Sequence, residues 1–306
     1  MKLVVLIPAF NEETTIGDVI SQIPRKISGI DLVQVLVVND GSTDKTIDCA
    51  LNGGADKIVS HRQNMGVGSA FMTGVRNAIT MQADILVTLD ADFQFDPKQI
   101  AEIIVPILNQ QTDMVIGSRF LNETPTGIPK IKLLGNQIFT KIVSKLMGQK
   151  FTDTQSGFRA YSKEALKNIS IVNNFTYTQE VLIDLKFKGM RIEEIPISVT
   201  YYKNRKSKVV KNIFDYGIRA LSIIIRTLAY HKPIFTFGFF GTILIIGGII
   251  AKIITITKIF GGEVSSDLSS GIILLGVVSF MMGLFASVIF KRQQVIEKNI
   301  RHYVDY

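Results

Sequence analysis

Residues Val87–Pro97 read VTLDADFQFDP, an apolar run that ends in two aspartates and leads into a proline. The apolar part is too short for a helix and is bounded by polar residues, so it predicts a buried strand. Proline is common at the first position of a helix, so a helix is expected to begin at Pro97. A strand that ends in carboxylates and leads into a helix is one unit of an α/β fold.

The same unit repeats along the first half of the chain. The expected strands are Lys2–Pro8, Val33–Asn39, Lys57–Ser60, Ile85–Leu89 and Met114–Gly117. The expected helices are roughly Thr15–Ile23, Gly68–Met81 and Pro97–Asn109. Continuous apolar strands that alternate with helices predict a parallel sheet covered on both faces. In such sheets, ligands bind beyond the carboxyl ends of the strands.

Polar residues gather at these carboxyl ends. PAFNEE follows the first strand, NDGSTD the second, DADFQ the fourth and GSRF the fifth. Because parallel strands end at the same edge of a sheet, all four motifs are expected to lie close together there. This convergence is better evidence for a functional site than any single motif.

Asp90 and Asp92 in DADFQ are two residues apart. In extended backbone, alternate side chains share a face and lie about 6.6 Å apart along the chain. Two carboxylates so placed repel each other unless a cation is bound, and hard divalent cations prefer oxygen ligands. The alternative is an acidic turn that caps the next helix. We assign the cap to Asp96, and metal binding to Asp90 and Asp92.

The other motifs leave two interpretations open. Asp40, in NDGSTD, could accept hydrogen bonds from a base or ribose, or it could belong to an ordinary turn. Glu12, in PAFNEE, could do the same or could favour a helix N-terminus. Asn64–Ala70 (NMGVGSA) predicts a tight turn that lets a helix approach the site. The three histidines are scattered, so no histidine metal site and no catalytic triad is expected.

The region after these motifs is expected to be mixed. The patterns predict a helix at Ile131–Met147, a loop with the sequence TDTQSGFRAYS, a helix near Tyr177–Lys188 and a strand at Arg191–Val199. A basic segment follows. Between Lys203 and Lys232 there are eight Lys or Arg residues and one acid, so most of the net charge of +8 lies there. Within it, Val209–Tyr230 predicts an amphipathic helix that can lie in a membrane interface.

Two uncharged stretches, Ile234–Ala251 and Gly271–Phe290, follow the basic segment. The second stretch as a helix would be about 30 Å long, enough to cross a bilayer. The alternative is a pair of buried helices in a soluble protein, which we disfavour because adjacent uncharged stretches of this length are rare there. The flanking segments are basic, so the positive-inside rule predicts that the globular region and both chain ends are cytoplasmic.

The composition excludes several classes of site. Of 306 residues, 47% are hydrophobic and 20% charged, as in a folded protein. The single cysteine, Cys49, excludes an intrachain disulfide and a cysteine zinc cluster. Met1 leads directly into a strand pattern, so no cleavable signal peptide is expected. The excess positive charge is confined to one segment beside the apolar stretches, so we expect a bilayer and no nucleic acid as its partner.

Six motifs carry a family resemblance: IPAFNEE, VVNDGSTD, NMGVGSA, TLDADFQFDP, GSRF and TDTQSGFRAYS. In their order and spacing, the chain resembles the inverting glycosyltransferases of family 2. Within that family it is most similar to polyprenyl-phosphate sugar synthases, namely dolichyl-phosphate mannose or glucose synthases and bactoprenol-phosphate glucosyltransferases. The likeness runs from Lys2 to about Lys208, and the two-helix tail resembles that of bacterial and some archaeal members.

The resemblance implies an α/β fold of the GT-A type, with a Rossmann-like, mostly parallel sheet, at residues 1–208. An amphipathic juxtamembrane helix is expected at 209–232, two transmembrane helices within 233–290 and a cytoplasmic tail at 291–306. The expected location is the plasma membrane, and the chain could form a homo-oligomer.

Roles for individual residues are also implied by the resemblance. The residues that would hold a nucleotide-diphosphate sugar are Pro8, Ala9, Phe10, Glu12, Asp40 and Asp90. Those that would hold Mg²⁺ or Mn²⁺ and the diphosphate are Asp90, Asp92 and Gln94. Arg119 would face the phosphates of donor or acceptor. The residues that would shape the sugar and acceptor region are Asp153, Gln155, Ser156, Arg159 and Ser207.

One motif departs from the family pattern. Relatives commonly show Arg-x-Gly-x-Ser-Lys near the end of the domain, whereas KNRKSK has Lys203 at the arginine and Arg205 at the glycine, and keeps Lys208. A lysine does not reproduce the arginine fork. Four side chains are therefore open candidates for binding the acceptor phosphate: Arg119, Lys132, Arg205 and Lys208.

The expected reaction is inverting transfer of a hexose, from a UDP-glucose or GDP-mannose type of donor, to a polyprenyl or dolichyl phosphate. A lipid phosphate is already ionised near neutral pH, so it needs cations to position it and no general base. A metal on Asp90 and Asp92 would neutralise the departing diphosphate. In-line attack would give a β-linked sugar from an α-linked donor, for use in glycan assembly such as protein glycosylation.

Two other functions stay open. The first is transfer to another lipid or to a growing saccharide; processive members of the family usually carry Gln-x-x-Arg-Trp, and this chain has no tryptophan. The second is a catalytically silent membrane scaffold, against which the intact pair Asp90 and Asp92 argues.

Overall fold

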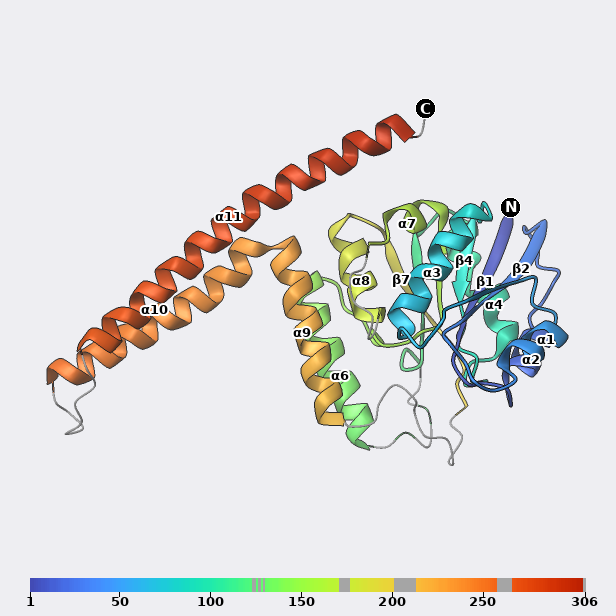
Figure 1. Ribbon diagram of the computed structural model, residues 1–306, viewed down its shortest axis with the longest axis horizontal. Coiled ribbons are helices and arrows are strands. Elements are labelled where there is room, and N and C mark those ends of the chain that lie inside the picture. The colour runs from blue at the N-terminus through green and yellow to red at the C-terminus, as the bar shows by residue number, and fades with distance from the viewer. Residues whose placement is uncertain are drawn as a thin grey trace. The chain divides into compact units, whose positions relative to one another are not determined.

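A computed structural model describes residues 1–122, 125, 128, 130–170, 177–200, 213–257 and 266–304. Within its helices, the side chains of residues 130–132, 213–217, 219–220, 266, 294–295 and 297–304 are outside this description. The chain divides into two compact units, a globular unit (Met1–Ile223) and a helical unit (Ile224–Tyr306). Figure 1 shows the elements of both units.

The globular unit is built on a sheet of seven strands in the order β3-β2-β1-β4-β6-β5-β7. The strands are β1 (Lys2–Ala9), β2 (Leu32–Asn39), β3 (Lys57–Ser60), β4 (Ile85–Thr88), β5 (Met114–Ser118), β6 (Arg159–Ser162) and β7 (Ile192–Pro196). Every strand pairs in parallel except β6, which is antiparallel to both β4 and β5. The predicted, mostly parallel sheet is confirmed, with one antiparallel strand in addition.

Strand β6 was expected to be part of a loop, and that expectation is wrong. Its four residues, RAYS, begin with an arginine and are too few to show an apolar run. They become a strand because they fit between β4 and β5, where Arg159 pairs with both Thr88 and Ile116. Since β6 runs against its neighbours, the loop that precedes it lies at the carboxyl ends of β4 and β5.

Helices cover both faces of this sheet (Figure 1). On one face, apolar residues of β1 and β2 form a continuous core with α1 (Ile16–Ser21), α2 (Thr46–Asn52), α4 (Ile100–Ile103) and α5 (Val105–Leu108). The other face carries α3 (Val67–Thr80) and α7 (Lys163–Asn168). On that face α3 packs closely on β1, because a Cβ on Gly74 would lie 2.3 Å from the Leu6 side chain.

The helix expected at Pro97–Asn109 is broken into three pieces. A 3₁₀ turn at Pro97–Gln99 precedes α4 and α5. Pro106 lies near the start of α5, where a proline removes a backbone N–H from the helical hydrogen-bond ladder. The assignment of Asp96 as the cap is confirmed, because its Oδ1 accepts a hydrogen bond from the Lys98 backbone N–H at 2.9 Å.

Three more helices belong wholly or partly to the globular unit. Helices α6 (Lys130–Met147) and α8 (Thr178–Phe187) contact each other. Helix α9 (Ile213–His231) spans the division between the two units and occupies most of the segment predicted to be an amphipathic helix. Residues 209–212 of that segment lie outside the described residues.

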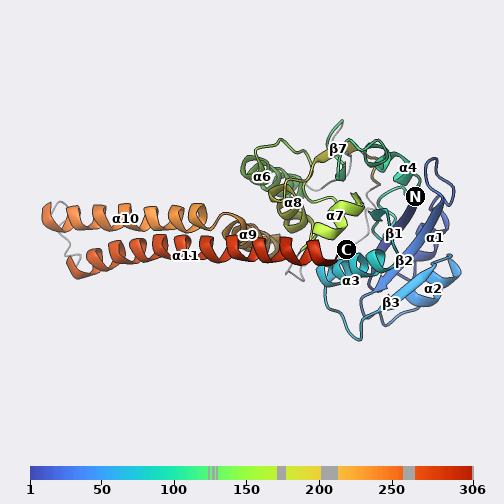
Figure 2. The ribbon, with the colours of Figure 1, turned by 90° about the horizontal axis from the view of Figure 1, so that it is seen from above.

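The helical unit contains α10 (Pro233–Thr257) and α11 (Ser266–Val304), which lie side by side (Figure 2). Glycines let the two helices approach closely: a Cβ on Gly241 would lie 2.7 Å from the Gly276 carbonyl oxygen. Both helices are long and apolar enough to cross a membrane. Large apolar side chains on them are exposed, among them Ile256 at 73% and Phe285 at 72%. This exposure disfavours buried helices of a soluble protein.

Candidate active site

The loops after β1 and β2 are joined by hydrogen bonds. The Asn11 backbone N–H donates to Ser42 Oγ at 2.9 Å, and the Thr43 N–H donates to Asn11 Oδ1 at 2.8 Å. The Glu12 N–H donates to Thr46 Oγ1 at 2.8 Å. Asn11 has a φ of 54°, a left-handed conformation that asparagine tolerates better than most residues. These bonds fix PAFNEE and NDGSTD to each other, as expected for motifs at one sheet edge.

Four of the residues predicted to hold a nucleotide lie together at the end of β1. Pro8 and Ala9 are its last two residues, and Phe10 and Glu12 follow in the loop. Pro8, Phe10 and Glu12 are half-buried. The Glu12 carbonyl accepts hydrogen bonds from the backbone N–H groups of Thr15 and Ile16 at the start of α1. The structure is thus compatible with both open roles of Glu12.

Asp40 is held by its own chain. Its side chain is almost fully buried, and its oxygens accept hydrogen bonds from the backbone N–H groups of Met65 and Gly66, both at 2.9 Å. His61 Nδ1 lies 2.7 Å from Asp40 Oδ1, and His61 Nε2 lies 2.9 Å from Thr73 Oγ1. Asp40 therefore anchors the turn that begins α3, and a contact with a nucleotide stays a prediction.

The contact of His61 with Asp40, a predicted site residue, is one that the sequence patterns did not reveal. Strands β2 and β3 are parallel neighbours in the register Asn39↔Ser60. The next residues along the two strands are Asp40 and His61, so the register brings their side chains together. This contact can be predicted only once the pairing of β2 with β3 is known.

The metal corner predicted at DADFQ lies at the end of β4. Asp90 and Asp92 are half-buried, and the Gln94 backbone N–H donates to Asp92 Oδ1 at 3.1 Å. Phe93, between Asp92 and Gln94, has a φ of 61°, which is unusual for a bulky residue. Such strain persists only where the surroundings enforce it, and it clusters at functional sites. Thr15 Oγ1 donates to the Ala91 carbonyl at 2.7 Å and ties this loop to PAFNEE.

Asp90 also lies against the loop that precedes β6. A Cβ on Gly157 would be 3.1 Å from both carboxylate oxygens of Asp90, which is tighter than an ordinary contact, so a side chain here would press against this carboxylate. Thr88 Oγ1 donates to the Gly157 carbonyl at 2.6 Å and fixes the glycine at the end of β4. Burial, together with the neighbouring Tyr161 hydroxyl and Asp90 carboxylate, raises the pKa of Tyr177 above its ordinary value. The metal corner and the TDTQSGFR loop are therefore one site.

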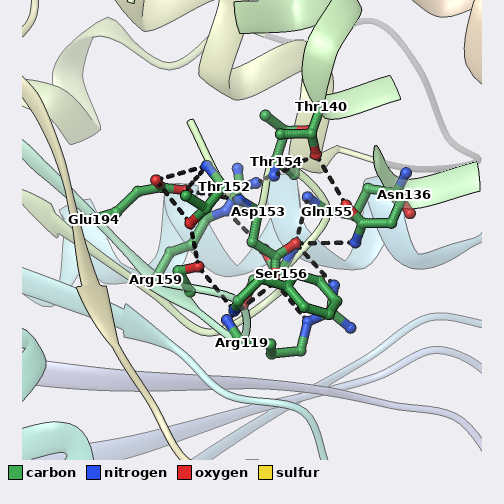
Figure 3. Close-up of polar contacts among 12 residues, drawn as sticks. Arg119, Asn136, Thr140, Thr152, Asp153, Thr154, Gln155, Ser156, Arg159 and Glu194 are labelled. Atoms are coloured by element: carbon green, nitrogen blue, oxygen red, sulfur yellow. Dashed lines mark hydrogen bonds and ion pairs between the residues drawn. The ribbon is translucent and has the colours of Figure 1, made fainter. Parts of the chain in front are cut away.

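Arg119, after β5, forms a forked ion pair with Asp153 in that same loop (Figure 3). Its Nε donates to Asp153 Oδ2 at 2.6 Å, and its Nη2 donates to Oδ1 at 2.9 Å. The side chain of Asp153 is 0% exposed and that of Arg119 is 15% exposed. A contact between Arg119 and a phosphate stays a prediction.

Further donors hold the buried carboxylate of Asp153. Asn136 Nδ2, on α6, donates to Oδ1 at 3.2 Å, and the backbone N–H groups of Gln155 and Ser156 donate to the same oxygen at 3.2 Å. Burial opposes ionisation, but the charge and hydrogen bonds of Arg119 outweigh it, so the pKa of Asp153 lies below its ordinary value. Asp153 is therefore an ionised carboxylate that fixes an arginine.

The other residues predicted for the sugar and acceptor region lie in or behind this loop. Arg159 is fully buried, and its guanidinium donates to the backbone carbonyls of Ser156, Thr178 and Thr154. It can therefore fix the backbone of the loop through Ser156 and Thr154. Gln155 Nε2 and Ser156 Oγ are buried atoms without a hydrogen-bond partner among the described residues.

Some of the residues predicted for the acceptor phosphate and the acceptor region lie outside the described residues. This applies to Arg205, Ser207 and Lys208, and to the side chain of Lys132, whose backbone belongs to α6. The described chain before residue 201 is anchored at the metal corner, because the Thr200 N–H donates to the Gln94 carbonyl at 2.9 Å and Val199 pairs with Phe95.

The donor atoms at DADFQ suit a hard divalent cation. Two carboxylates and one amide would supply oxygen ligands and leave positions for phosphate oxygens. Among the described residues, no group of three or more His, Cys, Asp or Glu side chains could hold a metal alone. The chemistry of this set therefore fits a metal that is shared between the protein and a phosphorylated ligand.

Comparisons with known proteins place the chain among sugar transferases. The model of the family described as glycosyl transferase family 2 matches residues 4–170. A UDP-N-acetylglucosamine–dolichyl-phosphate N-acetylglucosaminyltransferase of Methanococcus voltae is 35% identical over 64% of this chain and 84% of its own. A dolichyl-phosphate hexose transferase of Haloferax volcanii is 32% identical over 70% of this chain and 89% of its own.

Solved structures agree with the expected fold. A glucosyl-3-phosphoglycerate synthase of Mycobacterium tuberculosis, in complex with Mn²⁺, UDP-glucose and phosphoglyceric acid, is 25% identical and superposes with a TM-score of 0.58. The match covers 75% of this chain and 79% of that one. The predicted GT-A type of sheet is thereby confirmed.

Proposed function

This chain belongs to glycosyl transferase family 2, and from that premise we propose that it transfers a hexose from a nucleotide-diphosphate sugar to a polyprenyl or dolichyl phosphate. One observation carries the proposal: two half-sites meet at one sheet edge. Asp90, at the metal corner, lies against Gly157, and the same loop carries Asp153, which holds Arg119. A donor diphosphate and an acceptor phosphate could thus meet across this loop.

The donor half binds the nucleotide-diphosphate sugar. We assign the nucleotide to Pro8, Ala9, Phe10, Glu12, Asp40 and Asp90, and Mg²⁺ or Mn²⁺ to Asp90, Asp92 and Gln94. The relative named as a UDP-N-acetylglucosamine transferase and the solved complex with Mn²⁺ and UDP-glucose support a nucleotide-sugar donor and a divalent cation, and the roles of the individual residues are part of the proposal. A divalent cation held there would neutralise the charge that develops on the departing diphosphate.

The acceptor half positions a nucleophile that is already charged. A phosphate monoester is largely ionised near neutral pH, so the site needs cations and no general base. Arg119 is held at the edge of this half by Asp153, and Lys132, Arg205 and Lys208 are the further candidates. In-line attack on the anomeric carbon would invert it and give a β-linked sugar from an α-linked donor.

Helix α6 supports a lipid as the acceptor. Leu134, Ile138 and Ile142 are spaced four residues apart and are 57%, 49% and 36% exposed, so they form an apolar stripe on one face. The exposed lysines Lys141 and Lys145 lie on the same side of the helix. An apolar stripe with flanking lysines suits the surface of a bilayer with anionic lipids.

The two apolar helices support membrane association of the whole chain. We propose that α10 and α11 cross the bilayer and that the globular unit and both chain ends are cytoplasmic, as the basic flanks predict. Residues 209–232 would then lie in the interface, and residues 291–306 would form the second cytoplasmic segment. A homo-oligomer stays a prediction.

The proposal is tested with membranes that contain the protein. They are incubated with labelled UDP-glucose, UDP-N-acetylglucosamine or GDP-mannose, with polyprenyl phosphate and either Mg²⁺ or Mn²⁺. We expect a lipid-extractable labelled product that depends on the cation and is absent with Asp92→Ala. No product with any donor, from a folded protein, would favour the silent scaffold. A labelled product that needs a saccharide or another lipid would favour the other acceptor class.

A further inference from the structure

We infer that Glu194, on the edge strand β7, is a positioning residue for this reaction: it fixes Thr152 and Asp153 and, through them, the guanidinium of Arg119 (Figure 3). The inference rests on the proposed role of Arg119 toward a phosphate. Glu194 would touch neither substrate; its role is to hold the loop that aims the arginine.

The carboxylate of Glu194 is almost filled by this loop. It accepts hydrogen bonds from the Thr152 backbone N–H at 2.7 Å, from the Asp153 N–H at 2.8 Å and from Thr152 Oγ1 at 3.0 Å. A carboxylate has about four acceptor positions, so three donors nearly saturate it. Hydrogen bonds to an ionised acceptor are also stronger than neutral ones. The loop is therefore tied firmly to β7 at Thr152 and at Asp153, the residue that forms the ion pair with Arg119.

Two routes lead from Glu194 to Arg119. The first passes through Asp153, whose backbone bonds to Glu194 and whose carboxylate forms the fork with the arginine. The second passes through hydroxyl groups. Thr152 Oγ1 donates to Glu194, so it must accept from Ser118 Oγ, which lies 2.6 Å away. Ser118 precedes Arg119 in the chain, so both sides of the arginine depend on one carboxylate.

The position of Glu194 is costly, which favours a specific role. Burial raises the pKa of Glu194 above its ordinary value, and the nearby charge of Asp153 acts in the same direction. A carboxylate kept in such a place needs the backbone donors that it binds. Glu193, the preceding residue, is exposed and points to the other face of the strand. The two neighbouring acids therefore make a matched pair for substitution.

The test is a double-mutant cycle on the full-length protein in membranes. Glu194→Gln keeps the shape of the side chain but turns an N–H group toward the backbone donors. We expect kcat/KM for polyprenyl phosphate to fall about 10-fold to 100-fold, with KM for the donor within about 2-fold of wild type. In an Arg119→Lys background, the same change should cost less than about 2-fold. Glu193→Gln should leave all parameters unchanged.

A second variant tests the same link while it leaves the Glu194 carboxylate and its backbone hydrogen bonds in place. Thr152→Val keeps the backbone N–H bonded to Glu194 but removes the hydroxyl link to Ser118, and it should lower the same acceptor parameter by a smaller factor. Equal losses from Glu194→Gln in the wild-type and Arg119→Lys backgrounds would overturn the inference, as would a matching rise in the donor KM. An active wild type that is indifferent to Glu194→Gln overturns this inference alone. A wild type that makes no lipid-linked product overturns the proposed function first.

Discussion

The carboxylates in the two halves of the site are held in opposite ways. Asp90 and Asp92 are half-buried at a strand end, with a glycine making room for the oxygens of Asp90. Asp153 is fully buried and is bound by Arg119, Asn136 and backbone N–H groups. An accessible acid pair can take up a cation together with its ligand, whereas a neutralised, buried acid can only fix its partner. Under the proposed function, one residue type would thus bind a cation in the donor half and fix an arginine in the acceptor half.

The largest effect on activity is expected in the donor half of the site. Asp92→Ala removes a proposed metal ligand, so lipid-linked product should fall by at least about 10²-fold to 10³-fold in the labelled-donor assay. Asp96→Ala is the control, because this nearby aspartate only caps a 3₁₀ turn. It should lower the free energy of unfolding by about 1 kcal/mol and leave activity intact. Equal losses of activity from the two substitutions would contradict a separate role for Asp92.

In the acceptor half, the largest effect is expected on the stability of the folded protein. Asp153→Asn leaves the mostly buried Arg119 without its counter-ion, which should lower the free energy of unfolding by about 3 kcal/mol. The control is Asp113→Asn, which breaks an ion pair with the largely exposed Arg191 and should cost less than about 1 kcal/mol. Thermal unfolding of both variants in the same detergent would compare them. Similar losses would show that the buried pair is not special.

Gly157 connects the two halves, so its substitution sharpens the comparison between them. In Gly157→Ala, the new Cβ would lie 3.1 Å from the Asp90 oxygens and should displace them. We expect the concentration of Mn²⁺ that gives half-maximal activity to rise about 10-fold, with only a small change in stability. Gly135→Ala, on α6, is the control, since no atom lies within 4 Å of its Cβ position. An unchanged metal dependence in Gly157→Ala would count against metal binding by Asp90.

The smallest effect expected is on how stability depends on pH. Two acids of the acceptor half, Asp153 and Glu194, should change the stability in opposite directions as the pH falls. The pKa of Asp153 is lowered in the folded protein, so its contribution to stability is present above its ordinary value of 3.8 and is lost as the pH falls through the folded pKa. The pKa of Glu194 is raised above 4.5, so its ionisation costs stability at neutral pH and that cost disappears as the pH falls.

Thermal unfolding between pH 7 and pH 3 would separate the two acids. The stability difference between wild type and Asp153→Asn should shrink at the acid end of this range. The difference between wild type and Glu194→Gln should instead move in favour of wild type as the pH falls. The same direction of change for both variants would contradict the assignment.

Several features of the protein follow from its sequence alone. Short apolar runs predict the strands β1 to β5, because a buried strand needs such a run whatever surrounds it. Polar motifs directly after these runs predict the edge at which the site lies. The cap at Asp96 follows from the proline beside it, which is a local signal. The uncharged stretches predict α10 and α11, because length and apolarity are all that a membrane-crossing helix requires.

Other features were decided by tertiary structure. Strand β6 has no apolar run of its own and exists because it fills the space between β4 and β5. The contact between His61 and Asp40 depends on the register of two strands. Glu194 binds Thr152 from 42 residues away. Propensity and hydrophobic pattern act between near neighbours in the chain, whereas these pairings depend on where the strands lie in the sheet. The sequence therefore predicts the edge of the site, and the fold decides which charges meet there.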